Sequence, residues 1–130
     1  MEIAIFENEY ESVRFAFETA NLMYFDNKID FVIFPSSQSA NHADFGSFKV
    51  IFIDIDLSSK SHHDGYSLIE KIVSTDINLK NRIVILTGNN KINESLISRG
   101  LNNLKIIIKP TDYEEISKSI LSVVNSSRPL

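Results

Sequence analysis

The sequence predicts a single α/β domain in which helices cover both faces of a parallel sheet, a three-layer sandwich. Five short apolar runs, rich in β-branched and aromatic side chains, occupy residues 3–6, 31–34, 50–53, 83–86 and 104–108, and the last of them contains Lys105. Continuous rather than alternating apolar runs are typical of strands that are buried on both faces, as in a parallel sheet. Stretches with helical spacing separate most of these runs, and strands that alternate with helices imply right-handed crossovers. A length of 130 residues fits one domain with a full core.

Helices are predicted wherever apolar side chains recur every three or four residues between the runs. The faces that show this spacing are Val13, Phe17, Ala20 and Tyr24; Leu68, Ile69 and Ile72; and Tyr113, Ile116, Ile120 and Val124. The apolar spacing of Ile92, Leu96 and Ile97 predicts a further helix within residues 91–100, and Gly100 is suited to be its C-terminal cap. Residues 36–49 show little periodicity, so we expect only a short or irregular helix there.

Composition and charge exclude several classes of function. A formal net charge of -4 argues against a nucleic-acid surface, and the absence of cysteine removes disulfides, thiolate catalysis and cysteine-based zinc sites. The first residues lack the basic and apolar regions of a signal peptide, and no apolar stretch is long enough to cross a bilayer. We therefore expect a cytoplasmic protein without nucleic-acid or membrane partners, with a folded domain at 1–124 and a polar C-terminal tail at 125–130.

Three of the apolar runs end on a reactive side chain. The run at 50–53 is followed by Asp54, the run at 83–86 by Thr87, and the last run by Lys109 and Pro110. The carboxyl ends of parallel strands meet at one edge of a sheet, where open α/β sheets bind their ligands. A carboxylate, a hydroxyl and an ammonium at that edge are suited to handle phosphate, so we expect Asp54 to receive a phosphoryl group.

A metal ion is expected at the same edge, because the first run ends in Glu7, Asn8 and Glu9. Mg²⁺ commonly uses one or two carboxylates together with phosphate oxygens and water. An ionised Asp54 can attack phosphorus only if charge on the incoming group is neutralised, which Mg²⁺ and Lys109 can do together. A hydrogen bond from the Thr87 hydroxyl to a phosphoryl oxygen would then pull its loop toward the modified residue.

This set of residues resembles the receiver domain of two-component response regulators, and the resemblance covers essentially the whole chain. The family pattern is an acidic pair after the first strand, a phospho-accepting Asp after the third, Ser or Thr after the fourth and Lys-Pro after the fifth. The matching positions are Glu7-Asn8, Asp54, Thr87 and Lys109-Pro110. The resemblance implies a flavodoxin-like fold with strand order 2-1-3-4-5. The metal-site positions that it implies are Glu7, Asn8, Asp54 and Asp56.

The resemblance also implies a role. A stand-alone receiver would be phosphorylated on Asp54 by a sensor histidine kinase or a phosphotransfer protein, or by a small phosphodonor. It would signal by contact with an unknown downstream protein, and a homodimer is compatible with this role. Apart from Mg²⁺-dependent phosphorylation and dephosphorylation of Asp54, no enzymatic activity is expected.

The sequence departs from the family pattern at several positions. The second acidic position is Asn8, whose amide oxygen can ligate but brings no charge, so Mg²⁺ affinity should fall. The carboxylate of Asp56, where the family supplies a backbone carbonyl to the metal, could partly compensate. The loop 57–65 is longer than usual, and Ile106 takes the place of the usual switching Tyr or Phe.

Two alternatives therefore stay open. The first is a pseudo-receiver, a binding module of the same fold that does not need phosphorylation. The second is a phosphohydrolase of the haloacid-dehalogenase type, because Asp54, Asp56, Thr87 and Lys109 also resemble the first three motifs of that family. Its fourth acidic motif should follow on another strand, whereas the acids after the lysine are predicted to open the last helix. These acids are Asp112, Glu114 and Glu115.

Overall fold

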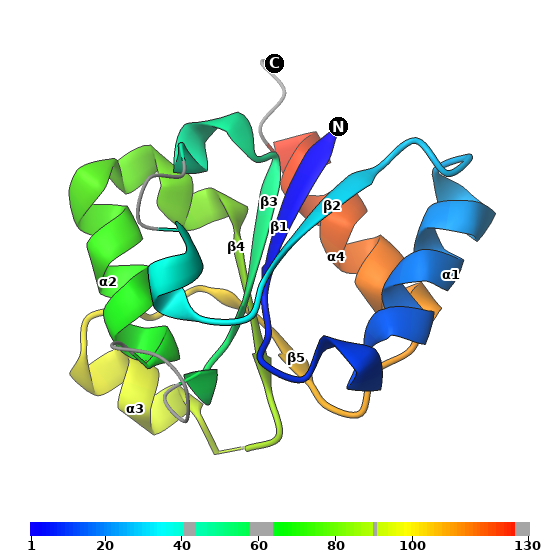
Figure 1. Cartoon of the computed structure of the whole chain (residues 1–130). Coiled ribbons are helices and arrows are strands. Elements are labelled where there is room, and N and C mark those ends of the chain that lie inside the picture. The colour runs from blue at the N-terminus through cyan, green and yellow to red at the C-terminus, as the bar shows by residue number, and fades with distance from the viewer. Residues whose placement is uncertain (41–43, 58–63, 90, 127–130) are drawn as a thin grey trace.

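The sheet is five-stranded and entirely parallel (Figure 1). The computed structural model describes residues 1–40, 44–57, 64–89 and 91–126. The strands are β1 (Glu2–Phe6), β2 (Asp30–Phe34), β3 (Val50–Asp54), β4 (Ile83–Thr87) and β5 (Lys105–Ile108). Their order is β2-β1-β3-β4-β5, which confirms the order expected from the resemblance.

Helices cover both faces of this sheet. The α-helices are α1 (Arg14–Tyr24), α2 (Gly65–Thr75), α3 (Asn93–Ser98) and α4 (Tyr113–Ser126). In Figure 1, α1 and α4 lie together on one side of the sheet and α2 and α3 lie on the other, so the predicted three layers are confirmed. None of the helices in the described residues is long and apolar enough to span a bilayer.

Two hydrophobic cores explain why the apolar runs are continuous. Because successive side chains of a strand point to opposite faces, Ile51 and Ile53 of β3 pack in the core beneath α2, while Val50 and Phe52 pack in the core beneath α1. All of β3 and β4 is buried. In the core beneath α1, the ring of Phe17 meets that of Phe52 edge to face, with centroids 4.8 Å apart.

The crossover between β2 and β3 contains only 3-10 turns in its described part, η2 (Ser37–Ala40) and η3 (Phe45–Ser47). This confirms the expectation of a short or irregular helix at 36–49. The end of the crossover is held by Arg82, the last residue of η5 (Ile77–Arg82). Its Nη1 donates to the carbonyl oxygens of Gly46 at 2.9 Å and Phe48 at 3.0 Å.

The predicted helix at 91–100 is real but shorter. It spans Asn93–Ser98, and Gly100 follows in the left-handed region at φ 72°, as a C-terminal cap requires. Arg99 fastens this end of α3 to α2: its Nη1 lies 2.9 Å from Glu70 Oε1, and its guanidinium lies 4.5 Å from the centre of the Tyr66 ring.

The last helix runs further than the sequence suggested. α4 includes Asn125 and Ser126, which the sequence predicts to lie in the polar tail. The Ser126 hydroxyl donates to the carbonyl of Val123 at 2.9 Å, so the side chain meets one of the backbone groups that a helix end leaves unpaired. Residues 127–130 lie outside the described part of the chain.

Candidate functional site

The carboxyl ends of the strands bring the predicted reactive residues to one edge of the sheet. Asp54 is the last residue of β3 and Thr87 the last of β4, while Glu7 directly follows β1 and Lys109 directly follows β5. Glu7, Asp54 and Thr87 are almost completely buried, with exposed fractions of 1%, 2% and 0%. Only the Lys109 side chain, at 23%, reaches solvent appreciably.

An ammonium lies between two carboxylates at this edge. Lys109 Nζ is 3.3 Å from Glu7 Oε2 and 3.5 Å from Asp54 Oδ1. The backbone adds further donors: Glu9 N–H donates to Glu7 Oε1 at 3.2 Å, and Asp56 N–H donates to Asp54 Oδ1 at 3.1 Å. We call Glu7, Asp54 and Lys109 the acid–lysine cluster.

Burial and charge shift the ionisation of the cluster. The pKa of Glu7 is raised from 4.5 to about 7. The larger cause is burial, which removes the carboxylate from water, and the second is the nearby charge of Asp54; the charge of Lys109 opposes both. Burial alone would lower the pKa of Lys109, but the charges of Asp54 and Glu7 outweigh it and raise that pKa. When both carboxyl groups are ionised, at a pH above about 7, the cluster carries one negative charge more than its single ammonium offsets.

Thr87 connects the ends of β4 and β5. Its backbone carbonyl accepts a hydrogen bond from Lys109 N–H at 2.7 Å, and its Oγ1 accepts one from Asn89 N–H at 3.0 Å. The Lys109–Pro110 peptide bond that follows is cis. A change in the orientation of the Thr87 hydroxyl would therefore alter the hydrogen bond that it accepts from the backbone of Asn89.

The sequence did not single out Asn89, although its side chain shapes this loop. Asn89 Oδ1 accepts from Lys91 N–H at 2.9 Å, so the side chain binds the backbone two residues further along. A Gly-Asn pair after a strand is a turn signal, so a local hydrogen bond of this kind could have been expected from Gly88 and Asn89. The hydrogen bond from Asn89 N–H to the Thr87 hydroxyl could not have been expected, because it depends on the path of the folded backbone.

The four positions expected at a metal site are not equivalent. Glu7 and Asp54 present buried carboxylates, Asn8 is partly buried, and the Asp56 side chain is exposed. Within the described residues, no group of three or more His, Cys, Asp or Glu side chains is placed to hold a metal. Two carboxylates with an excess of negative charge nevertheless match Mg²⁺, which commonly takes only one or two carboxylates and completes its shell with water and phosphate oxygens.

The acids that follow Lys109 lie at the start of α4, and one of them caps the helix. Asp112 Oδ1 accepts from Glu115 N–H at 2.9 Å and so caps the first turn of α4. Asp112, Glu114 and Glu115 are all exposed, and all lie at the start of the helix rather than on a strand. The fourth motif that a haloacid-dehalogenase-type enzyme needs is therefore missing from the strands of the described sheet.

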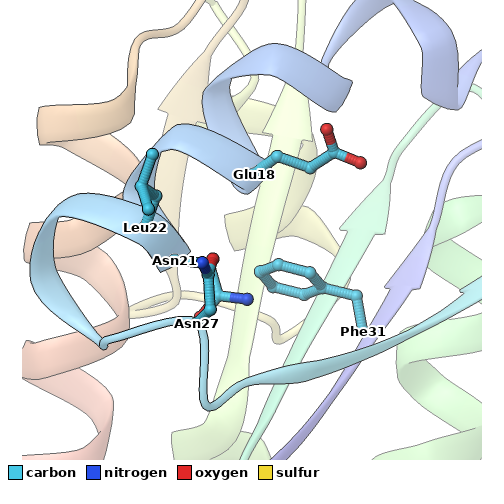
Figure 2. A pocket seen from close by; sticks show the side chains of 5 residues that line it. All are labelled: Glu18, Asn21, Leu22, Asn27 and Phe31. Atoms are coloured by element: carbon cyan, nitrogen blue, oxygen red, sulfur yellow. The ribbon is translucent and has the colours of Figure 1, made fainter.

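Two cavities lie beside α1 or the acid–lysine cluster. One, of about 340 Å³, adjoins the acid–lysine cluster and is lined by Ser12, Val13, Lys109, Pro110 and Thr111. The other, of about 460 Å³, lies between α1 and the edge strand β2; Figure 2 shows the side chains that line it, Glu18, Asn21, Leu22, Asn27 and Phe31. None of these belongs to the cluster, so the second cavity is separate from the site.

Comparison with solved structures identifies the fold. The receiver domain of NtrX from Brucella abortus superposes with a TM-score of 0.73 at 20% identity, over 96% of this chain and 99% of that one. The receiver domain of HemR from Leptospira biflexa, in its non-phosphorylated form, gives 0.74 at 22% identity over 99% and 98%. The chain has the receiver-domain fold. A CheY-like receiver protein from Methanospirillum hungatei also matches, with a TM-score of 0.71 at 16% identity over 96% and 94%.

Sequence comparison adds no closer relationship, since no family model and no curated protein matches this chain. Within the receiver fold, Ile106 is a partly buried β5 residue that packs against the core beneath α2 and α3. Its aliphatic side chain carries neither an aromatic ring nor a polar group. Of the extended loop at 57–65, residues 58–63 lie outside the described part of the chain.

Proposed function

We propose that this chain is a response regulator receiver that accepts a phosphoryl group on Asp54 in a two-component phosphorelay and signals by protein contact. The observation that carries the proposal is the acid–lysine cluster, with Lys109 Nζ 3.5 Å from Asp54 Oδ1 at the carboxyl edge of the sheet. A histidine kinase or a phosphotransfer protein would be the donor, and the reaction would take place in the cytoplasm.

The chemistry follows from the positions of the side chains. A carboxylate oxygen of Asp54 attacks the phosphorus of a phosphohistidine or an acyl phosphate and forms a new P–O bond. The bond between phosphorus and the donor atom breaks, and its electron pair leaves with the donor's imidazole or carboxylate. Lys109 offsets negative charge on the transferred group, and the Thr87 hydroxyl is at the correct edge to donate to one of its oxygens.

Glu7 and Asp54, with the amide oxygen of Asn8 and the backbone at Asp56, are the groups that would hold Mg²⁺. When bound, the ion would supply positive charge beside the phosphoryl oxygens, which reduces their repulsion of the attacking carboxylate. Because Asn8 adds no charge, the site should bind Mg²⁺ more weakly than one with a second acid at that position.

Signalling would begin at Thr87. In the unmodified protein the Thr87 hydroxyl accepts a hydrogen bond from Asn89 N–H. When the same hydroxyl donates to a phosphoryl oxygen, it would be reoriented. The backbone at Gly88 and Asn89 would then move, and with it the surface formed by α3 and β5 would change. Ile106 provides no aromatic ring to follow this movement, so we expect the change to remain close to α3.

Intact mass measurement tests this function. The protein is incubated with acetyl phosphate, with and without Mg²⁺, beside an Asp54→Asn variant that retains the shape of the side chain. A phosphoryl adduct that requires both Mg²⁺ and Asp54 is the expected result. An adduct that persists in Asp54→Asn, or the absence of any adduct in folded protein, would contradict the proposal.

The pseudo-receiver is the second candidate, and one observation favours it. Lys109 already contacts both carboxylates, so the pair is partly neutralised without a metal or a phosphoryl group. A pseudo-receiver would bind its partner equally well with acetyl phosphate present or absent. A phosphorylatable receiver would bind the same partner with an affinity that depends on the adduct.

A further inference from the structure

Gly65, the first residue of α2, lies directly against the backbone of the residue that is expected to be phosphorylated. A Cβ atom built at this position would be 2.5 Å from the carbonyl oxygen of Asp54, 2.5 Å from Ile55 Cα and 3.0 Å from the Ile55 carbonyl carbon. Gly65 is buried, and its N–H donates to the Ile55 carbonyl at 3.1 Å. Its φ lies outside the left-handed region, so the constraint here is space rather than backbone conformation.

The neighbouring atoms cannot yield easily, because they belong to the backbone. On the other side of this segment, Ile55 N–H donates to the Leu86 carbonyl of β4 at 3.0 Å. The backbone at positions 54 and 55 therefore lies between β4 and the first residue of α2. A methyl group at position 65 would displace either the start of α2 or the segment that carries the Asp54 carboxylate and the Asp56 N–H that donates to it.

The start of α2 is itself fixed by a capping hydrogen bond. Asp64 Oδ1 accepts from Ser67 N–H at 2.8 Å, and the Asp64 carbonyl accepts from Leu68 N–H at 3.1 Å. These bonds hold the first turn of the helix, and with it Gly65, in one position.

We propose that Gly65 is a positioning residue for the phosphorylation of Asp54: the absence of a side chain lets α2 begin against the Asp54–Ile55 backbone, and this contact sets the direction of the Asp54 carboxylate. The inference rests on the proposed function and names a residue that affects the rate of phosphoryl transfer to Asp54. Small displacements of a reacting group lower rates steeply, because its orientation is part of the catalytic advantage.

The test compares Gly65→Ala with Gly46→Ala. Position 46 is a suitable control because it lies before β3, and its added Cβ would meet only a side-chain atom, Asp44 Oδ1 at 3.2 Å. The rate of phosphoryl uptake from acetyl phosphate is measured at saturating Mg²⁺, under conditions in which circular dichroism shows every variant to be folded. We expect Gly65→Ala to slow uptake by about tenfold to a hundredfold and Gly46→Ala by less than about twofold.

A second pair of variants covers the case in which Gly65→Ala does not fold. Asp64→Ala removes the capping bond without adding atoms at the contact, whereas Asp64→Asn keeps an acceptor oxygen. We expect Asp64→Ala to slow uptake by about threefold and Asp64→Asn to leave it unchanged, since only the former loosens the first turn. Equal rates in folded Gly65→Ala and wild type, or in the two Asp64 variants, would overturn the inference.

A structural readout separates this inference from the proposed function. Backbone amide resonances of Asp54, Ile55 and Asp56 are compared in Gly65→Ala and Gly46→Ala without a phosphodonor. If the wild-type protein takes up no phosphoryl group, the proposed function fails, and these resonances alone decide whether Gly65 positions Asp54. Shifts confined to Gly65→Ala would support the positioning contact, and unchanged resonances would refute it.

Discussion

Replacement of Glu7 by Gln should remove most of the dependence of stability on pH near neutrality. The pKa of Glu7 is raised from 4.5 to about 7, so the folded protein holds a proton between these values that the unfolded chain releases. A carboxyl group of this kind contributes stability that is present below pH 4.5 and is lost as the pH rises through 7. One pKa unit corresponds to about 1.4 kcal/mol, so the full loss is on the order of 3 kcal/mol.

The assay is urea unfolding of wild type and Glu7→Gln at pH 5 and pH 8 without Mg²⁺. Between these two conditions the wild type should lose about 2 to 3 kcal/mol more of its free energy of unfolding than the variant does, because Gln cannot ionise. Contributions from titrating groups that do not interact with Glu7 cancel in this double difference. An equal pH dependence in the two proteins would show that the burial of Glu7 does not govern its ionisation.

Three further predictions concern the metal site, the core and two arginines. Asn8→Asp should increase Mg²⁺ affinity by about tenfold in a calorimetric titration, because it adds one charge beside the cluster; unchanged affinity would show that Asn8 is not near the ion. Phe17→Ala should lower the free energy of unfolding by about 3 to 5 kcal/mol in urea titrations, since its fully buried ring packs against Phe52; a loss below about 1 kcal/mol would mean that the core closes around the gap. Arg82→Ala, which leaves two backbone carbonyls without their donor, should destabilise by about 1 to 3 kcal/mol, whereas Arg99→Ala, which breaks an exposed ion pair, should cost no more than about 1 kcal/mol. The reverse ranking of the two arginines would contradict this reasoning.

The strands could be predicted because burial on both faces leaves a direct mark on the sequence, whereas their order was expected only from the resemblance to receiver domains. Runs such as residues 50–53 and 83–86 are continuously apolar, and they became fully buried strands. The convergence of Asp54, Thr87 and Lys109 at one edge follows from parallel topology alone, since each ends or follows a strand.

Other features depend on contacts between distant parts of the chain and could not be read from local pattern. Nothing near Asp56 in the sequence indicates that its side chain points to solvent while its N–H binds Asp54. The close approach of Gly65 to Asp54 depends on the placement of a whole helix. The length of α4 was underestimated because Asn125 and Ser126 are polar, and polar residues at a helix end resemble a tail.

The contact between Arg99 and the ring of Tyr66 has a practical consequence. The chain contains four tyrosines and no tryptophan, so its intrinsic fluorescence comes from tyrosine alone. Tyr66 directly follows Gly65, and a guanidinium lies 4.5 Å from its ring centre. A variant in which the other three tyrosines are replaced by phenylalanine would therefore emit from a single residue at the start of α2, and would serve as an optical reporter of movement behind Asp54 without any attached dye.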